Sequence, residues 1–173
     1  MTQINGLPDG ATELDRAWGT RPRLYEVFMS DFNASLARAD AALIELCRLR
    51  TATILGSGFD QNLRYVPARA RGLKEEKIHA LPDYLKSPLF TTRERLAIGF
   101  AELFAIQSNS IGDEDVARVQ EALGAESFIY FVKALSVVDQ LQRSVVAFDV
   151  RPGPAAPSTM AGFVTAASAA SAA

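Results

Sequence analysis

Five residues between positions 45 and 65 carry the side chains best suited to chemistry in this sequence. Ser57, Asp60 and Arg64 are spaced i, i+3 and i+7, so they share one face if this stretch is helical. Glu45 precedes them in an otherwise apolar run, where burial would raise its pKa toward the range useful for proton transfer. Glu45 and Asp60 could then act as acid and base, with Ser57 beside them, while Arg64 holds an anionic substrate.

A structural interpretation of the same residues stays open. Asp60 and Arg64, at i and i+4, could form a surface ion pair of little energetic value. Glu45 could pair with an arginine, such as Arg48 or Arg64, and close a buried network. Tyr65 could donate a hydrogen bond to a substrate oxygen, although packing explains it more simply. A ligand-sized pocket walled by Glu45, Asp60 and Arg64 would distinguish catalysis from structure.

The elements that must position these residues are helices. A helix is predicted from Asp40, with apolar residues at helical spacing up to Ile54, and Gly56 and Gly58 end it. The following segment, 59–71, has a helical composition but contains Pro67. It is therefore expected either to kink there or to end near Arg64, with a new helix beginning near Pro67.

The rest of the chain continues the helical pattern. Helical periodicity is predicted from Pro22 onwards, and Thr91 with Glu94 forms a capping-box pattern that opens a long helix. The expected fold is an all-α bundle of about six or seven helices in one domain, residues 1–150. Residues 151–173 consist mainly of Pro, Ala and Ser, which predicts a disordered tail that is dispensable for folding.

Composition excludes several classes of function. The 18 basic and 20 acidic residues give a net charge of −2, which argues against a general nucleic-acid-binding protein. The sequence has no apolar run long enough for a membrane span and no secretory signal, so a cytoplasmic protein is expected. A single cysteine, Cys47, precludes an internal disulfide, and neither a metal-ligand set nor a cofactor motif is present.

Several short blocks, in order, resemble the carboxymuconolactone decarboxylase superfamily on its alkylhydroperoxidase D-like (AhpD-like) side. They span roughly residues 20–149. The blocks are Ile44-Glu45-Leu46-Cys47-Arg48-Leu49-Arg50, a glycine-containing turn, a basic segment ending at Gly72-Leu73, Leu81-Pro82-Asp83-Tyr84, Ser87-Pro88-Leu89-Phe90-Thr91 and Arg93-Glu94-Arg95-Leu96. The resemblance implies an AhpD-like helical bundle and a homo-oligomer.

The residues that carry this family's redox chemistry are missing. Redox members have Cys-x-x-Cys-x-x-x-His, with a Glu twelve residues before the first Cys. Glu45 matches the Glu, whereas Ser57 and Asp60 stand at the two Cys positions and Arg64 at the His position. Peroxidase activity by a dithiol route is therefore not expected, and Cys47, in an apolar run, is interpreted as a buried structural residue.

Two functions follow as expectations. The first is a non-redox enzyme that acts by acid/base chemistry on a small organic acid, lactone or carbonyl compound, as a lyase, isomerase or hydrolase. Its small-molecule substrate would contact Arg64 and Tyr65. The second is a non-catalytic member of the family that binds a ligand or serves as an oligomeric subunit. Neither requires a nucleic acid, a membrane or a cofactor.

Overall fold

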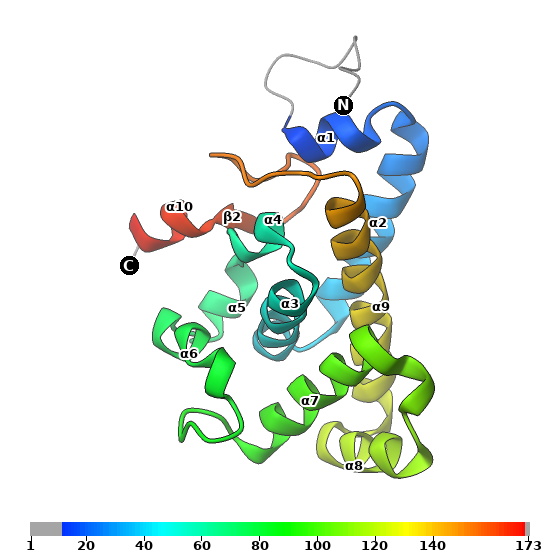
Figure 1. The fold of residues 1–173 in the computed structure, drawn as a ribbon, viewed down its shortest axis with the longest axis vertical. Helices are drawn as coiled ribbons and strands as arrows, with labels where there is room; N and C mark the ends of the chain where they lie inside the picture. Colours follow the sequence, from blue (N-terminus) through cyan, green and yellow to red (C-terminus); the bar gives the residue numbers. More distant parts are fainter. Residues whose placement is uncertain (1–11, 172–173) are drawn as a thin grey trace.

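The computed structural model describes residues 12–171, which fold into a helical bundle around one central helix, α3 (Figure 1). Within these residues there are ten α-helices, two short 3₁₀ helices and two three-residue strands. Their bounds are α1 Glu13–Trp18, α2 Pro22–Arg38, α3 Ala41–Leu55, α4 Gly58–Gln61, β1 Leu63–Tyr65, α5 Val66–Ala70, α6 Glu75–His79, η1 Leu81–Asp83, α7 Thr92–Gln107, η2 Ser108–Ser110, α8 Asp113–Leu123, α9 Ala125–Ala147, β2 Phe163–Thr165 and α10 Ala166–Ser171.

Helix α3 is fixed at both ends by its own caps. The Asp40 side chain accepts hydrogen bonds from the amides of Ala42 and Leu43, and Gly56 ends the helix in the left-handed conformation at φ 72°. A side chain is disfavoured at this φ, so glycine suits the position. The capping box predicted at Thr91 and Glu94 is confirmed at the start of α7.

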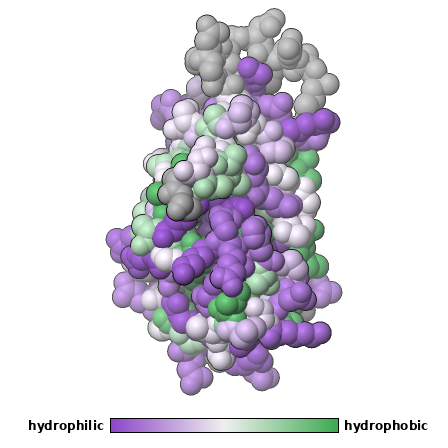
Figure 2. Space-filling model, turned by 90° about the vertical axis from the view of Figure 1, so that its left-hand side faces the viewer, coloured by the Kyte–Doolittle hydropathy of each residue, from purple (hydrophilic) through white to green (hydrophobic). Residues whose placement is uncertain are grey.

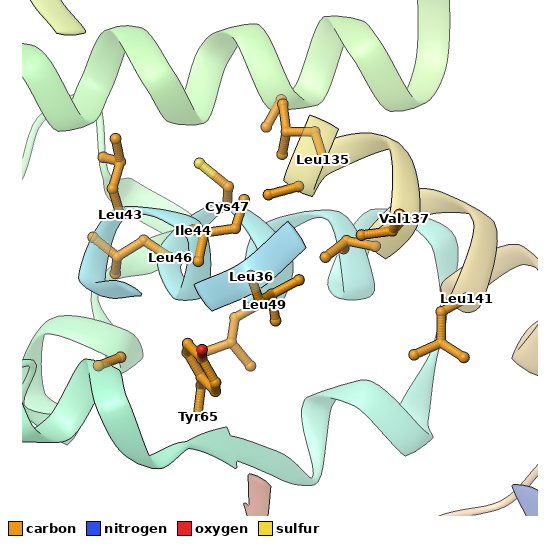
Figure 3. Close-up of a cluster of buried hydrophobic side chains, with 14 of the residues drawn as sticks. Leu36, Leu43, Ile44, Leu46, Cys47, Leu49, Tyr65, Leu135, Val137 and Leu141 are labelled. Atoms are coloured by element: carbon orange, nitrogen blue, oxygen red, sulfur yellow. The ribbon is translucent and has the colours of Figure 1, made fainter. Parts of the chain in front are cut away.

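The hydrophobic core surrounds α3 on nearly all sides. Helices α7 and α9 pack against it, and α2 lies antiparallel beside α9. Figure 3 shows apolar side chains of α3, including Cys47, packed against Leu135, Val137 and Leu141 of α9. Because α3 is covered on most sides, its apolar residues lie all round the helix rather than along one stripe, with the charged residues Glu45, Arg48 and Arg50 among them.

The prediction of a disordered C-terminal tail is wrong for residues 151–171. This segment runs across one end of the bundle, and β2 pairs antiparallel with β1, with Tyr65 opposite Phe163 and Leu63 opposite Thr165. Met160 and Phe163 are buried. The composition is poor in apolar residues, but these two side chains, the strand pairing and hydrogen bonds such as that from Asn33 to the Thr159 carbonyl oxygen hold the segment on the bundle.

Gly162 allows the C-terminal segment to approach β1 closely. It adopts φ 81°, and an added Cβ atom would lie 3.3 Å from atoms of both Tyr65 and Pro67. Its carbonyl oxygen accepts a hydrogen bond from the Val66 amide at 2.7 Å. The backbone conformation therefore favours glycine here, and the close approach of Tyr65 and Pro67 leaves little room for a side chain.

The stretch after Gly56 is not one helix. α4 ends at Gln61, β1 follows, and α5 begins at Val66 with Pro67 in its first turn. The expected interruption of the helix before Pro67 is present, but the strand β1 separates α4 from α5. The reason is a tertiary one, since the backbone groups of β1 find their partners in β2, about a hundred residues later.

Candidate functional site: a buried arginine–carboxylate cluster

Arg48 occupies the centre of the region in which catalytic residues were predicted. It lies on α3, its exposed fraction is 1%, and its Nε and Nη2 atoms donate to the two carboxylate oxygens of Glu45 at 2.7 and 2.9 Å. This two-pronged geometry is the strongest arrangement of an arginine and a carboxylate. The i, i+3 spacing of the two residues on α3 makes it possible.

The same guanidinium ties α3 to the segment that follows it. Nη1 donates to the carbonyl oxygen of Asp60 at 2.8 Å and to its carboxylate at 3.4 Å. Nη2 also donates to the carbonyl oxygen of Leu63 at 2.9 Å. With these bonds every nitrogen of the Arg48 side chain has an acceptor, as a buried guanidinium requires.

The two carboxylates are also held from their other sides. The Glu45 Oε1 atom accepts a hydrogen bond from the Tyr65 amide at 3.0 Å. Ser57 caps α4, and its hydroxyl donates to the Asp60 carboxylate at 2.5 Å. Glu45, Arg48, Ser57 and Asp60, each 1% exposed, form what we call the Arg48 cluster.

Burial raises the pKa of Asp60 above its usual range, although the positive charge of Arg48 and the hydrogen bond from Ser57 act in the opposite direction. Such a carboxyl group binds more protons in the folded than in the unfolded protein once the pH exceeds about 4. Its contribution to stability is therefore complete below about pH 4 and is lost as the pH rises through the pKa of the folded state.

We expect Asp60→Asn to remove this pH dependence, because asparagine has no proton to lose. The unfolding free energies of wild type and variant are measured by urea denaturation from about pH 4 to pH 7. The stability of the variant relative to wild type should increase as the pH rises. Other titrating groups, such as Asp40 and Glu94 with their lowered pKa values, are common to both proteins and cancel. A difference that stays constant with pH would contradict this assignment.

Arg64 does not join the cluster. Its Nε atom donates to the Glu75 carboxylate of α6 at 2.9 and 3.1 Å, and its Nη1 atom donates to the carbonyl oxygens of Gln61 and Leu63. The predicted helical face of Ser57, Asp60 and Arg64 is wrong because α4 ends at Gln61. Asp60 instead faces Arg48, and Arg64 lies in β1 with its side chain directed toward α6.

The face of the molecule that carries α5 and α6 is hydrophilic across its middle (Figure 2). Glu75 of α6 pairs there with Arg64 and, at 3.8 Å, with Arg69. His79, the single histidine of the sequence, is exposed at the end of α6. Arg64 thus serves to attach α6 to β1 in this arrangement.

Tyr65 packs rather than facing a cavity. Its ring stacks on Phe163 of β2, with 4.8 Å between ring centroids. The Phe163 ring also lies 5.3 Å from the guanidinium carbon of Arg48. The C-terminal strand therefore covers the Arg48 cluster, and the Tyr65 backbone amide, not its hydroxyl, contacts Glu45.

Sequence reasoning did not assign Arg48 as the central residue. It named Arg48 as one of several arginines that could pair with Glu45. A stronger signal was present, because Arg48 stands three residues after Glu45 in a run that is otherwise apolar. Gln142 of α9 adds a further contact, donating to the Arg48 carbonyl oxygen at 2.8 Å.

Cys47 is completely buried, and burial raises the pKa of its thiol well above the usual range. A thiol in this state is a poor nucleophile. Among residues 12–171, no group of three or more His, Cys, Asp and Glu side chains could hold a metal ion. No helix in the described part of the chain combines the length and apolar character needed to cross a membrane.

The chain resembles a crystal structure of a protein of unknown function from Agrobacterium tumefaciens, for which a role as the antioxidant defence protein AhpD has been suggested. The TM-score is 0.70 at 19% sequence identity, and the match covers 88% of this chain and 99% of the other. No protein-family model and no curated protein matches the sequence. At this identity the likeness establishes the fold.

Proposed function

We propose that this chain, which has the AhpD-like helical fold, is a non-redox protein in which the Arg48 cluster stabilises the fold and does not take part in catalysis. It would then act by binding a small molecule or as a subunit of a homo-oligomer. The observation that supports this most strongly is that both carboxylate oxygens of Glu45 are already engaged, since they accept three hydrogen bonds from Arg48 and Tyr65.

The position of the cluster supports the same proposal. A general base must lie within hydrogen-bond reach of the substrate proton that it removes. Glu45 and Asp60 are each 1% exposed, and Phe163 covers the cluster. A substrate would have to displace the C-terminal strand and replace bonds to Arg48.

An acid/base enzyme acting on a small organic acid, lactone or carbonyl compound is the second candidate. One observation favours it, namely the raised pKa of Asp60, which is the kind of shift found at catalytic carboxyl groups. Buried structural ion pairs shift pKa values as well. For this reason the first candidate is preferred.

Glu45→Gln distinguishes the two candidates, because glutamine keeps the shape of the side chain but loses its charge. A structural role predicts that the unfolding free energy falls by about 1–3 kcal/mol, since Arg48 loses its main partner. Glu26→Gln, at an exposed position of α2, is the control and should change stability by less than about 0.5 kcal/mol. Urea denaturation measures both, and a Glu45→Gln protein as stable as wild type would support the acid/base enzyme.

The oligomeric form of this proposal predicts a mass greater than that of one chain in light scattering at micromolar concentration, and a monomer there would contradict it. Exposed apolar side chains on two neighbouring helices support it. Leu24 and Val27 lie near the start of α2, and Val146 lies near the end of α9. Trp18 contacts both Phe28 of α2 and Phe148, so these helix ends lie together.

A further inference from the structure

A cavity of about 280 Å³ lies between α7, α8 and the residues that follow η1, and none of the residues of the Arg48 cluster lines it. Figure 1 shows α8 beside α7 at the lower end of the molecule. The apolar lining of the cavity comes from Leu85, Leu96, Gly99, Phe100, Leu103 and Val119. The volume is just below the range typical of drug-sized ligands, so it suits a smaller molecule.

The charged residues of the cavity have an excess of positive charge. Arg95 and Arg118 line it together with one carboxylate, Asp115. The Asp115 carboxylate already accepts a hydrogen bond from the Gly112 amide at 3.1 Å. An anionic group that enters the cavity would therefore be attracted rather than repelled.

Arg95 is held in place without being neutralised. Its Nε atom donates to the carbonyl oxygen of Tyr84 at 3.2 Å and its Nη2 atom to that of Ser87 at 2.8 Å. Carbonyl oxygens fix the side chain but carry no net charge. Within residues 12–171 neither Arg95 nor Arg118 has a carboxylate within ion-pair distance, in contrast to Arg93, two residues earlier on α7, which pairs with Asp40.

Gly99 opens the floor of this cavity. It stands in the interior of α7, where glycine is less favourable than any residue except proline. Its backbone conformation does not require glycine, and an added Cβ atom would meet only the Tyr84 hydroxyl, at an ordinary contact distance of 3.5 Å. The missing side chain therefore serves no turn or close packing of the backbone, and its effect is to leave space in the cavity beside Tyr84.

We propose that this cavity binds a small monocarboxylate with an apolar body, with the carboxylate at Arg118 and Arg95 and the body over Gly99. This deepens the ligand-binding form of the proposed function and does not depend on the role of the Arg48 cluster. An apolar body matches the lining, and a single negative charge matches the excess of one guanidinium over the carboxylate of Asp115.

The test is an NMR titration of the full chain with benzoate and hexanoate, each compared with its neutral amide. We expect the carboxylates to bind at least roughly tenfold more tightly than the amides, as one charge-assisted hydrogen bond provides. Arg118→Gln should weaken the carboxylates by roughly tenfold and leave the amides unchanged. Arg23→Gln is the matched control, because Arg23 is also exposed and lies on α2.

Two substitutions at Gly99 test the location. Gly99→Leu fills the cavity and should abolish binding, whereas Gly99→Ala should keep affinity within about threefold, since its added atom makes an ordinary contact. Circular dichroism verifies that both variants are folded, and Arg118→Gln tests the site independently if Gly99→Leu does not fold.

Carboxylate binding unchanged by these variants would overturn this inference but leave a ligand-binding function elsewhere. Equal binding of amide and carboxylate would overturn the anionic specificity that we propose. No binding of either compound would overturn the whole inference and leave the oligomeric form of the proposed function.

Discussion

Replacing Arg48 with methionine should lower the unfolding free energy by about 3–5 kcal/mol, as expected when one partner of a buried ion pair is removed. Methionine fills much of the same space but leaves Glu45 and Asp60 buried without a cation. The carbonyl oxygens of Asp60 and Leu63 also each lose the hydrogen bond that Arg48 donates. Against a typical total of about 5–15 kcal/mol, such a loss is a large fraction of the stability of the fold.

A dependence on pH would identify the cause of this loss. Without Arg48, the Asp60 carboxyl group loses the positive charge that opposes the effect of burial on its pKa. That pKa then rises further in the folded state, so the folded protein binds more protons than the unfolded one. The deficit of the variant should therefore shrink as the pH falls toward about 4. Lys133→Met is the control, because Lys133 and Asp31 form an ion pair that is about half exposed and should contribute at most about 1 kcal/mol. A deficit below about 1 kcal/mol for Arg48→Met would contradict the structural role of the cluster.

Phe163→Ala should cost about 3–5 kcal/mol, the usual loss for a buried phenylalanine. Phe163 is 7% exposed, and its ring contacts Tyr65, Phe32 and the Arg48 guanidinium. If the variant undocks the C-terminal segment altogether, its stability equals that of a chain truncated after Val150. Truncation should therefore be at least as destabilising as Phe163→Ala, which reverses the expectation from composition.

Thermal and urea denaturation of Phe163→Ala, the truncated chain and Ile129→Ala provide the comparison. Ile129 is a large apolar side chain that is 64% exposed, so its truncation to alanine should cost less than about 1 kcal/mol. A truncated chain that melts within a few degrees of wild type would show that the docked segment contributes little to stability.

The helical bundle could be predicted from the sequence because the evidence for it is local. The period of apolar residues, the capping box at Thr91 and the glycine at position 56 each act within a few residues, and all are present as expected. The AhpD-like fold followed from short blocks in the same region, and the structural similarity supports it.

The surroundings of the predicted site depend on partners distant in sequence. Arg64 was placed on a helical face with Asp60, but pairing with β2 turns this stretch into a strand. The docking of the C-terminal segment depends on Phe163 and Met160, two apolar residues in a run of small ones. Neither effect can be read from periodicity, because each requires a neighbour about a hundred residues away in the chain.

The pairing of β1 with β2 also sets an order of events during synthesis. β2 follows β1 by about 100 residues, so at ~5–20 residues per second the ribosome needs about 5–20 s to produce it after β1. During that interval the nascent chain can form α3 and the Arg48–Glu45 pair, while β1 remains an unpaired edge and the cluster lacks the cover of Phe163. A chaperone or another strand would meet this surface before the chain's own C-terminal segment does.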